Sequence, residues 1–302
     1  MTSPYIITLV APQNTNLNDE DVHLVRNMAE AAGFVVGAET WLAENQAMDL
    51  PLRASDESQR EGLVSRLKTE LEHVDAIFQP DDGNRRKKLL ICDMDSTIIQ
   101  QECIDELADE MGIKPHVAKI TERAMRGELD FKMALRERVG LLKGLEVEAL
   151  QRVYDNRIKF MPGAKELVAT MHAHGAFCML VSGGFTYFTG KVRDALGFDS
   201  DSANILEVAD GKLSGVVVEP ILDKEAKLFA LKEAAYKHDT RLTQTLAIGD
   251  GANDLPMLQA AGLGIAYHAK PAVRLAAAAC INHCDLRAAL YAQGYKKSEF
   301  TH

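Results

Sequence analysis

Four short apolar runs restrict the fold of this 302-residue chain more than any other feature. They span residues 89–92, 176–181, 245–248 and 263–266, and none alternates between apolar and polar residues. Runs of this kind are expected for strands that are buried on both faces of a parallel sheet. Because helical patterns separate them, we predict a doubly wound α/β fold with a parallel sheet for residues 83–302.

A long helical stretch interrupts this alternation after the first apolar run. Between about residues 102 and 159, apolar residues such as Ile104, Leu107 and Met111 recur at helical spacing, and no strand pattern stands out. An insertion at this point would lie over the carboxyl end of the first strand, where ligands bind in such sheets. We therefore predict a helical cap over the functional site.

The N-terminal part of the chain follows a different pattern. Strand patterns at residues 5–10, 34–41, 48–53 and 74–78 are joined by helical patterns near residues 22–33 and 63–71. The order β-α-β-β-α-β is that of a small ferredoxin-like domain.

A polar, turn-prone and charge-rich segment at residues 79–88 follows this pattern. We place a domain boundary there and expect one domain at 1–82 and a second at 83–302. Because every candidate catalytic motif follows the boundary, a chain that begins near Arg85 is expected to fold and to remain active.

The charge balance and the cysteines narrow the classes of function. A net charge of −10 argues against a nucleic-acid binder and against a protein of anionic membrane surfaces. No apolar run approaches the roughly 20 residues of a membrane helix, and the N-terminus lacks the pattern of a secretory signal. Five cysteines do not suggest a disulfide framework, and Cys280 and Cys284 lack the partners of a zinc site. We expect a cytoplasmic protein with no nucleic-acid or membrane partner.

The strongest chemical signal is the pair Asp93 and Asp95, directly after the apolar run 89–92. Two carboxylates on a tight turn are costly to bury without a cation. A turn or a helix N-cap is the simpler interpretation of so short a motif, because Asp, Ser and Thr favour both. A calcium loop of the EF-hand type is excluded, since Ile98 stands where that loop needs glycine.

A second motif at a strand end, residues 249–254, favours a cation site over a simple turn or N-cap. It places Asp250 and Asp254 after the apolar run 245–248, with glycines that permit close backbone approach. By itself it is typical of a solvated turn. Together with Asp93 and Asp95, it offers the hard oxygen ligands that a Mg²⁺ ion shared with a phosphate requires.

Two further features fit an anion site. Ser182 and Gly183 follow the run 176–181, where a hydroxyl and bare N–H groups at a helix start can bind an anion. A strand-to-helix turn capped by Ser182 is an equal alternative. Lys227 is placed to neutralise phosphoryl charge, although Lys224 is an equally near candidate and a surface lysine is the simpler interpretation.

The ordered set of these motifs resembles the haloacid dehalogenase-like phosphohydrolases, and among them most closely the phosphoserine phosphatases. The set comprises D-x-D-S-T at residues 93–97, a serine at a strand end, a lysine, and G-D-G-A-N-D at residues 249–254. The resemblance extends over about residues 88–290. Met94 stands where the family often has phenylalanine, an apolar change that affects no catalytic group.

The resemblance implies a role for each matched residue. Asp93 would be the nucleophile that forms an aspartyl-phosphate, and Asp95 the general acid and base. Mg²⁺ would be held by Asp93, the backbone carbonyl of Asp95 and Asp250, with Asp254 in support. The residues implied to hold the phosphoryl group and orient the substrate are Ser182, Gly183, Lys227 and Asn253.

In the predicted cap, Glu102 and Arg138 resemble the residues that bind the ammonium and carboxylate groups of the substrate. Ordinary charges on a helix surface are the alternative for both. The implied reaction is Mg²⁺-dependent hydrolysis of O-phosphoserine, the last step of serine biosynthesis. Two other functions stay open: the same chemistry on another small phosphomonoester, and a non-enzymatic amino-acid sensor.

The N-terminal pattern resembles the ACT-type amino-acid-binding modules found on some members of the family. This resemblance is weaker than that of the phosphatase motifs. It makes serine sensing, or a homodimer formed through residues 1–82, candidate roles for the first domain.

Overall fold

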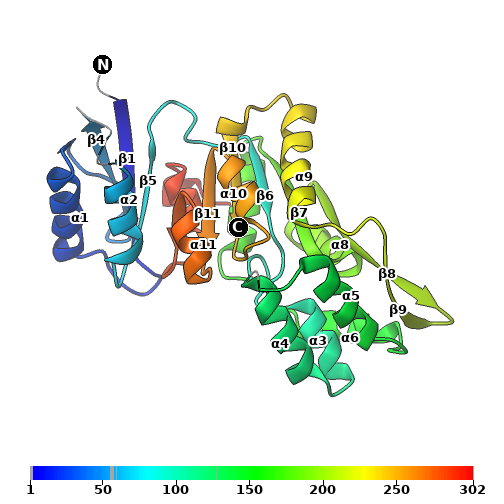
Figure 1. Ribbon diagram of the computed structural model, residues 1–302. Helices are drawn as coiled ribbons and strands as arrows, with labels where there is room; N and C mark the ends of the chain where they lie inside the picture. The colour runs from blue at the N-terminus through cyan, green and yellow to red at the C-terminus, as the bar shows by residue number, and fades with distance from the viewer. Residues whose placement is uncertain (1–2, 55–57, 59, 127, 302) are drawn as a thin grey trace.

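The computed structural model describes residues 3–54, 58, 60–126 and 128–301. Figure 1 shows the N-terminal sheet on the left, the larger sheet in the centre and a group of helices below and to the right of it. No helix in these ranges has the length and the apolar character that spanning a membrane would require.

The N-terminal part forms an antiparallel sheet of strand order β2-β4-β1-β5, and the short strand β3 also pairs with β4. Its elements are β1 (Ser3–Val10), α1 (Asp19–Ala31), β2 (Phe34–Val36), β3 (Thr40–Ala43), β4 (Ala47–Ala54), α2 (Arg60–Thr69) and β5 (Asp75–Pro80). The element order is the predicted one, except that the strand expected at 34–41 is divided into β2 and β3. The N–H of Gly37 donates to the carbonyl of Pro51, but Pro51 has no N–H to return, so the ladder is interrupted there.

The larger sheet has the strand order β12-β11-β10-β6-β7-β8-β9 and is parallel except for the pair β8–β9. Its strands are β6 (Leu89–Cys92), β7 (Phe177–Phe185), β8 (Ser200–Ala209), β9 (Lys212–Val218), β10 (Thr245–Gly249), β11 (Leu263–Tyr267) and β12 (Ala279–Ile281). Its helices are α7 (Ala164–Ala173), α8 (Thr186–Leu196), α9 (Lys224–Lys237), α10 (Leu255–Ala260), α11 (Pro271–Ala276) and α12 (Ala288–Ala292). The four predicted strands are β6, β7, β10 and β11. Strands β8, β9 and β12 were not predicted.

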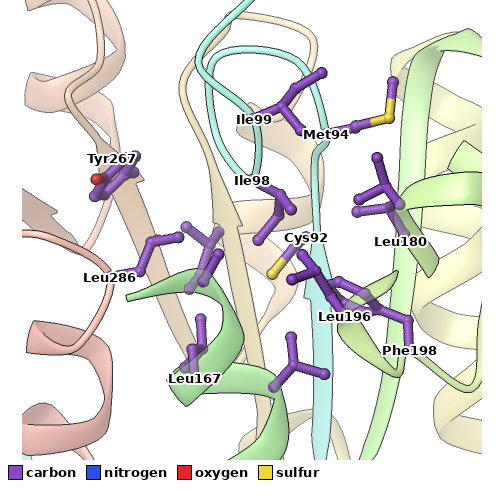
Figure 2. Close-up of a cluster of buried hydrophobic side chains, with 14 of the residues drawn as sticks. Cys92, Met94, Ile98, Ile99, Leu167, Leu180, Leu196, Phe198, Tyr267 and Leu286 are labelled. Atoms are coloured by element: carbon purple, nitrogen blue, oxygen red, sulfur yellow. The ribbon is translucent and has the colours of Figure 1, made fainter. Parts of the chain in front are cut away.

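Both faces of the central strands β6, β10 and β11 are buried, which explains why these strands lack alternation. On β6, Leu90 and Cys92 pack into one apolar cluster, whereas Leu89 and Ile91 pack into a second cluster on the opposite face. Figure 2 shows how the first cluster continues past the strand, with Met94, Ile98 and Ile99 beside Cys92. The loop after β6 is therefore anchored by buried side chains that flank the predicted catalytic carboxylates.

The helices below the larger sheet in Figure 1 occupy the segment predicted as a cap. They are α3 (Cys103–Glu110), α4 (Lys114–Met125), α5 (Phe131–Leu141) and α6 (Glu148–Arg157). The unpredicted hairpin β8–β9 joins them: Leu213 exchanges backbone hydrogen bonds with the loop after α5, donating to Leu145 and accepting from Gly144. The cap is thus held by the edge of the sheet as well as by its own helices.

The contact between the N-terminal sheet and the larger sheet is specific and polar. The carboxylate of Asp75, at the start of β5, accepts the backbone N–H groups of Asn282, His283 and Cys284 at 2.7–3.1 Å. The side chain of Arg85 forms a two-pronged ion pair with Asp49 and donates to the carbonyl of Ala292. Arg85, in the segment 79–88 where we place the domain boundary, therefore joins the two parts through its side chain, and the independent folding of a chain that begins near Arg85 stays a prediction.

Candidate active site

Three neighbouring strands of the larger sheet, in the order β10-β6-β7, bring the separate motifs to one edge. Asp93 follows β6, Ser182 lies near the end of β7, and Asp250 follows β10. Parallel strands have their carboxyl ends at the same edge, so motifs about 70 to 90 residues apart in sequence meet there. All three side chains are buried.

An acidic cluster with one bound lysine forms the floor of this site. Carboxylate oxygens of Asp93, Asp250 and Asp254 lie within 4.8 Å of one another. The Lys227 Nζ is 2.8 Å from Asp93 Oδ2 and 2.7 Å from Asp254 Oδ1, and the lysine is only 1% exposed. The competing Lys224 has a side chain that is 58% exposed, so the structure places Lys227 and not Lys224 in the site.

The electrostatics of the cluster follow from its burial. Burial raises the pKa of Asp93 to about 8, with Asp254 adding to the rise and Lys227 opposing it. Burial also raises the pKa of Asp250 well above its usual value, and nearby carboxylates contribute. Burial alone would lower the pKa of Lys227, but Asp254 and Asp93 outweigh it and raise the pKa above the usual value.

The cluster suits a metal cation. Three carboxylates against one ammonium group leave an excess of negative charge in a buried place, and all available donors are hard oxygens. Within the described ranges, this is the one group of His, Cys, Asp or Glu side chains with the spacing of a metal site. Cys280 and Cys284 are free buried thiols.

The side chain of Asp95 points to a different part of the site than the acidic cluster. Its Oδ1 accepts the backbone N–H of Cys103 at 3.1 Å, and its Oδ2 lies 3.5 Å from the Ser182 Oγ, which donates to it. Burial raises the pKa of Asp95.

Asp254, predicted only as a supporting residue, is a full member of the acidic cluster, and its Oδ2 accepts the N–H of Gly251 at 3.0 Å.

The last residues of β7 fit closely against Asp95 and the cap, and two of them are glycines. A Cβ atom on Gly184 would lie 2.6 Å from Asp95 Oδ2, and one on Gly183 would lie 2.8 Å from the ring of Phe131 in the cap. The N–H of Gly184 donates to the Ser182 Oγ at 2.8 Å. The two glycines therefore allow this end of β7 to approach both Asp95 and the cap.

The cap contributes two charged groups to the cavity beside the end of β7. Glu102 accepts a hydrogen bond from the Ser96 hydroxyl at 2.6 Å, and burial together with Asp95 raises the pKa of Glu102 to about 8. Arg138 is 5% exposed, and burial lowers its pKa. The cavity also contains the amide of Asn253, whose buried Oδ1 has no partner among the described residues. Its principal lining residues are Asp93, Asp95, Glu102, Phe131, Arg138, Ser182, Gly183 and Asn253.

The structure thus brings every predicted site residue to one edge of the sheet or to the cap above it. It also adds Ser96, which bonds Glu102, and Thr97, whose hydroxyl lies 3.4 Å from Asp250 Oδ1. Both belong to the D-x-D-S-T motif, so their position beside the catalytic carboxylates could have been predicted from the sequence. Thr121, which bonds Arg138, had no such signal because it lies on another helix, outside any motif.

Comparison with known proteins agrees with this geometry. Residues 90–259 match the family model of the haloacid dehalogenase-like hydrolases. A phosphoserine phosphatase of Archaeoglobus fulgidus is 47% identical over 212 residues, which cover 69% of this chain and 61% of that relative. The phosphoserine phosphatase of Saccharomyces cerevisiae is 36% identical over 304 residues and 98% of both chains. A solved structure described as a phospho-aspartyl intermediate analogue of phosphoserine phosphatase matches 68% of this chain and 98% of its own, with 42% identity and a TM-score of 0.66.

Proposed function

Because the chain belongs to the haloacid dehalogenase-like hydrolases, and within them to the phosphoserine phosphatases, we propose that it hydrolyses O-phosphoserine to serine and phosphate. One observation carries this proposal. A buried carboxylate at the strand end, Asp93, shares a cavity with an acidic group, Glu102, and a basic group, Arg138, from the cap. Phosphoserine has a phosphate, an ammonium group and a carboxylate, one for each of these three partners.

Asp93 is the proposed nucleophile. Its carboxylate attacks the phosphorus, the bond from phosphorus to the serine oxygen breaks, and an aspartyl-phosphate forms. Asp95 donates a proton to the departing serine oxygen and then takes one from the water that attacks the phosphorus. The bond from phosphorus to Asp93 breaks in that second step, which releases phosphate. The raised pKa of Asp95 supports a role that needs its protonated form first.

Groups around the nucleophile hold the phosphoryl oxygens. Lys227 already contacts Asp93 and is placed to balance the charge of a bound phosphoryl group. The Ser182 hydroxyl and the backbone of Gly183 approach the same cavity from β7. The buried Oδ1 of Asn253, which has no partner among the described residues, can accept a hydrogen bond from the substrate, and the Nδ2 of the same amide can donate to a phosphoryl oxygen. Phosphoryl transfer depends mainly on positioning and charge neutralisation, so this set of groups is sufficient.

The metal that we propose is Mg²⁺. Asp93, Asp250 and the backbone carbonyl of Asp95 would hold it, with Asp254 fixing Lys227 beside them. When bound, the ion would neutralise the charge of the phosphoryl group. The excess of carboxylates in the buried cluster supports a divalent cation, and all its donors are the oxygens that Mg²⁺ prefers.

Phosphate release from a panel of esters tests the proposal. Wild-type protein with Mg²⁺ should hydrolyse phosphoserine well, phosphoethanolamine poorly and an ester with neither amine nor carboxylate least. Arg138→Ala should raise the KM for phosphoserine sharply, by roughly 10- to 100-fold, because a charge-assisted contact is lost. Arg138→Lys should restore only part of the affinity, because a point charge cannot replace the planar fork. Preference for another ester would favour the alternative of a different small phosphomonoester, and release from none would favour the amino-acid sensor.

The remaining parts of the proposal concern context. We place the reaction at the end of serine biosynthesis and the protein in the cytoplasm, which its five free, buried cysteines support. The N-terminal sheet, which has the β-α-β-β-α-β order, is the proposed ACT-like domain and the candidate surface for a homodimer.

A further inference from the structure

A network of hydrogen-bonded side chains links three cap helices and includes Arg138. Its members are Asp105 on α3, Thr121 on α4 and the guanidinium of Arg138 on α5. The Thr121 Oγ1 lies 2.7 Å from Asp105 Oδ1, and the Arg138 Nη1 lies 3.0 Å from the same Oγ1. Thr121 is buried, although threonine is a poor helix former and its hydroxyl is costly to bury without partners.

The direction of these hydrogen bonds is fixed by chemistry. A guanidinium can only donate, so the Thr121 hydroxyl accepts from Arg138. The hydroxyl has one hydrogen of its own, with the carbonyl of Val117 at 3.2 Å and the Asp105 carboxylate at 2.7 Å as acceptors. The shorter, charge-assisted contact with Asp105 is the favoured one. Arg138 therefore donates to Thr121, and Thr121 donates to Asp105.

This arrangement holds the guanidinium while leaving most of its donors unused. Besides Thr121, the Arg138 side chain donates from Nε to the carbonyl of Ala134. Among the residues that the structure describes, the hydrogen bonds of its guanidinium are to Thr121 and Ala134, and it forms no ion pair there. Three of its five N–H groups remain for a ligand in the cavity that it lines. The negative charge of Asp105 reaches the guanidinium only through the Thr121 hydroxyl, so Asp105 does not use the N–H groups that would bind a ligand.

From this geometry we propose that Thr121 is a positioning residue that aims the free edge of the Arg138 guanidinium at the carboxylate of the substrate. The inference rests on the proposed function and adds a determinant of specificity that lies outside the cavity lining. Arg138 has several rotatable bonds, and a free guanidinium would lose affinity through disorder. The hydroxyl removes that freedom before the substrate arrives.

Steady-state kinetics on two substrates tests the proposal. Thr121→Val keeps the branched shape but removes the hydroxyl, and Thr121→Ser keeps the hydroxyl. Thr189→Val is the matched control, because Thr189 is also buried on a helix and its hydroxyl donates to Asp201 at 2.6 Å, away from the cavity. The substrates are phosphoserine and phosphoethanolamine, which lacks the carboxylate.

We expect Thr121→Val to raise the KM for phosphoserine about tenfold with kcat nearly unchanged, since a hydrogen bond to a charged group is lost. The KM for phosphoethanolamine should stay within about twofold of the wild-type value, and Thr121→Ser should restore the phosphoserine KM. Thr189→Val should move neither. Asp105→Asn, which still accepts the hydroxyl but without charge, should raise the phosphoserine KM by a smaller factor.

Each other outcome counts against the proposal in a recognisable way. Equal loss on both substrates would mean that Thr121 supports only the fold of the cap. An unchanged phosphoserine KM in Thr121→Val would mean that Arg138 needs no such guide. If wild-type protein itself fails to prefer phosphoserine over phosphoethanolamine, the proposed function fails, and the role of Thr121 fails with it.

Discussion

Replacing Lys227 by methionine tests the electrostatic argument for the site most directly. The change removes the ammonium group that lies 2.8 Å from Asp93 and 2.7 Å from Asp254, while keeping a side chain of similar length. Removing one partner of a buried ion pair costs about 3–5 kcal/mol of unfolding free energy. Burial already raises the pKa of Asp93 while Lys227 opposes the rise, so loss of the lysine raises that pKa further and favours the protonated carboxyl. We therefore expect a loss near the lower limit, about 3 kcal/mol.

Urea unfolding at pH 7 measures this loss, first with a chelator and then with Mg²⁺. In the chelator, Lys227→Met should unfold at a clearly lower urea concentration than wild type. With Mg²⁺ the difference should shrink, because a cation bound to the same carboxylates relieves their repulsion. Phosphate release should fall strongly in both conditions, because the charge that faces the phosphoryl group is lost.

Lys237→Met on the same helix is the matched control. Lys237 pairs with Glu233 at 2.8 Å, but its side chain is 64% exposed. Such a surface pair contributes about 0.3–0.5 kcal/mol, so this variant should unfold almost as wild type does. If Lys227→Met and Lys237→Met lose the same small amount of stability without metal, the acidic cluster is not held together as we describe.

Four other predictions follow from the site and its support. Asp93→Asn should abolish turnover with the fold retained, and phosphate release at the wild-type rate would refute its role as nucleophile. Mg²⁺ should support turnover and Ca²⁺ should not, since Ca²⁺ accepts both oxygens of a carboxylate and would occupy the nucleophile; equal rates with the two ions would refute this. The pKa of Glu102 is about 8 when folded against roughly 4.3 when unfolded, so it makes stability fall as pH rises from about 4 to 8. Glu102→Gln should flatten that fall in urea titrations with chelator, and a curve parallel to wild type would contradict it. Asp75→Ala leaves three backbone N–H groups without their acceptor and should cost about 2–3 kcal/mol in urea unfolding without changing the KM for phosphoserine; unchanged stability would show that the contact between the two sheets is dispensable.

Much of the catalytic floor could be predicted from sequence because its information is local. A strand that is buried on both faces must be apolar throughout, so the apolar run Leu89–Cys92 is recognisable as a strand. Asp93 and Asp95 follow this strand within three positions. The same holds for Asp250 after Thr245–Gly249. Parallel strands then bring these ends together without further information.

Other features were decided only by the tertiary structure. Lys224 and Lys227 are indistinguishable in sequence, and one turn of α9 determines which of them is buried against Asp93 and which faces solvent. The hairpin β8–β9 carries apolar residues on an exposed face, so its strands lack the pattern of the central ones.

Contacts between distant segments gave no sequence signal at all. Thr121 meets Arg138, and Asp75 meets the loop after β12, only because separately folded segments pack in one particular arrangement. A hydrogen bond of this kind depends on the relative position of two whole elements to within a few tenths of an ångström. Local patterns of apolar and polar residues determine what each element is, whereas the packing of the complete chain determines which side chains meet.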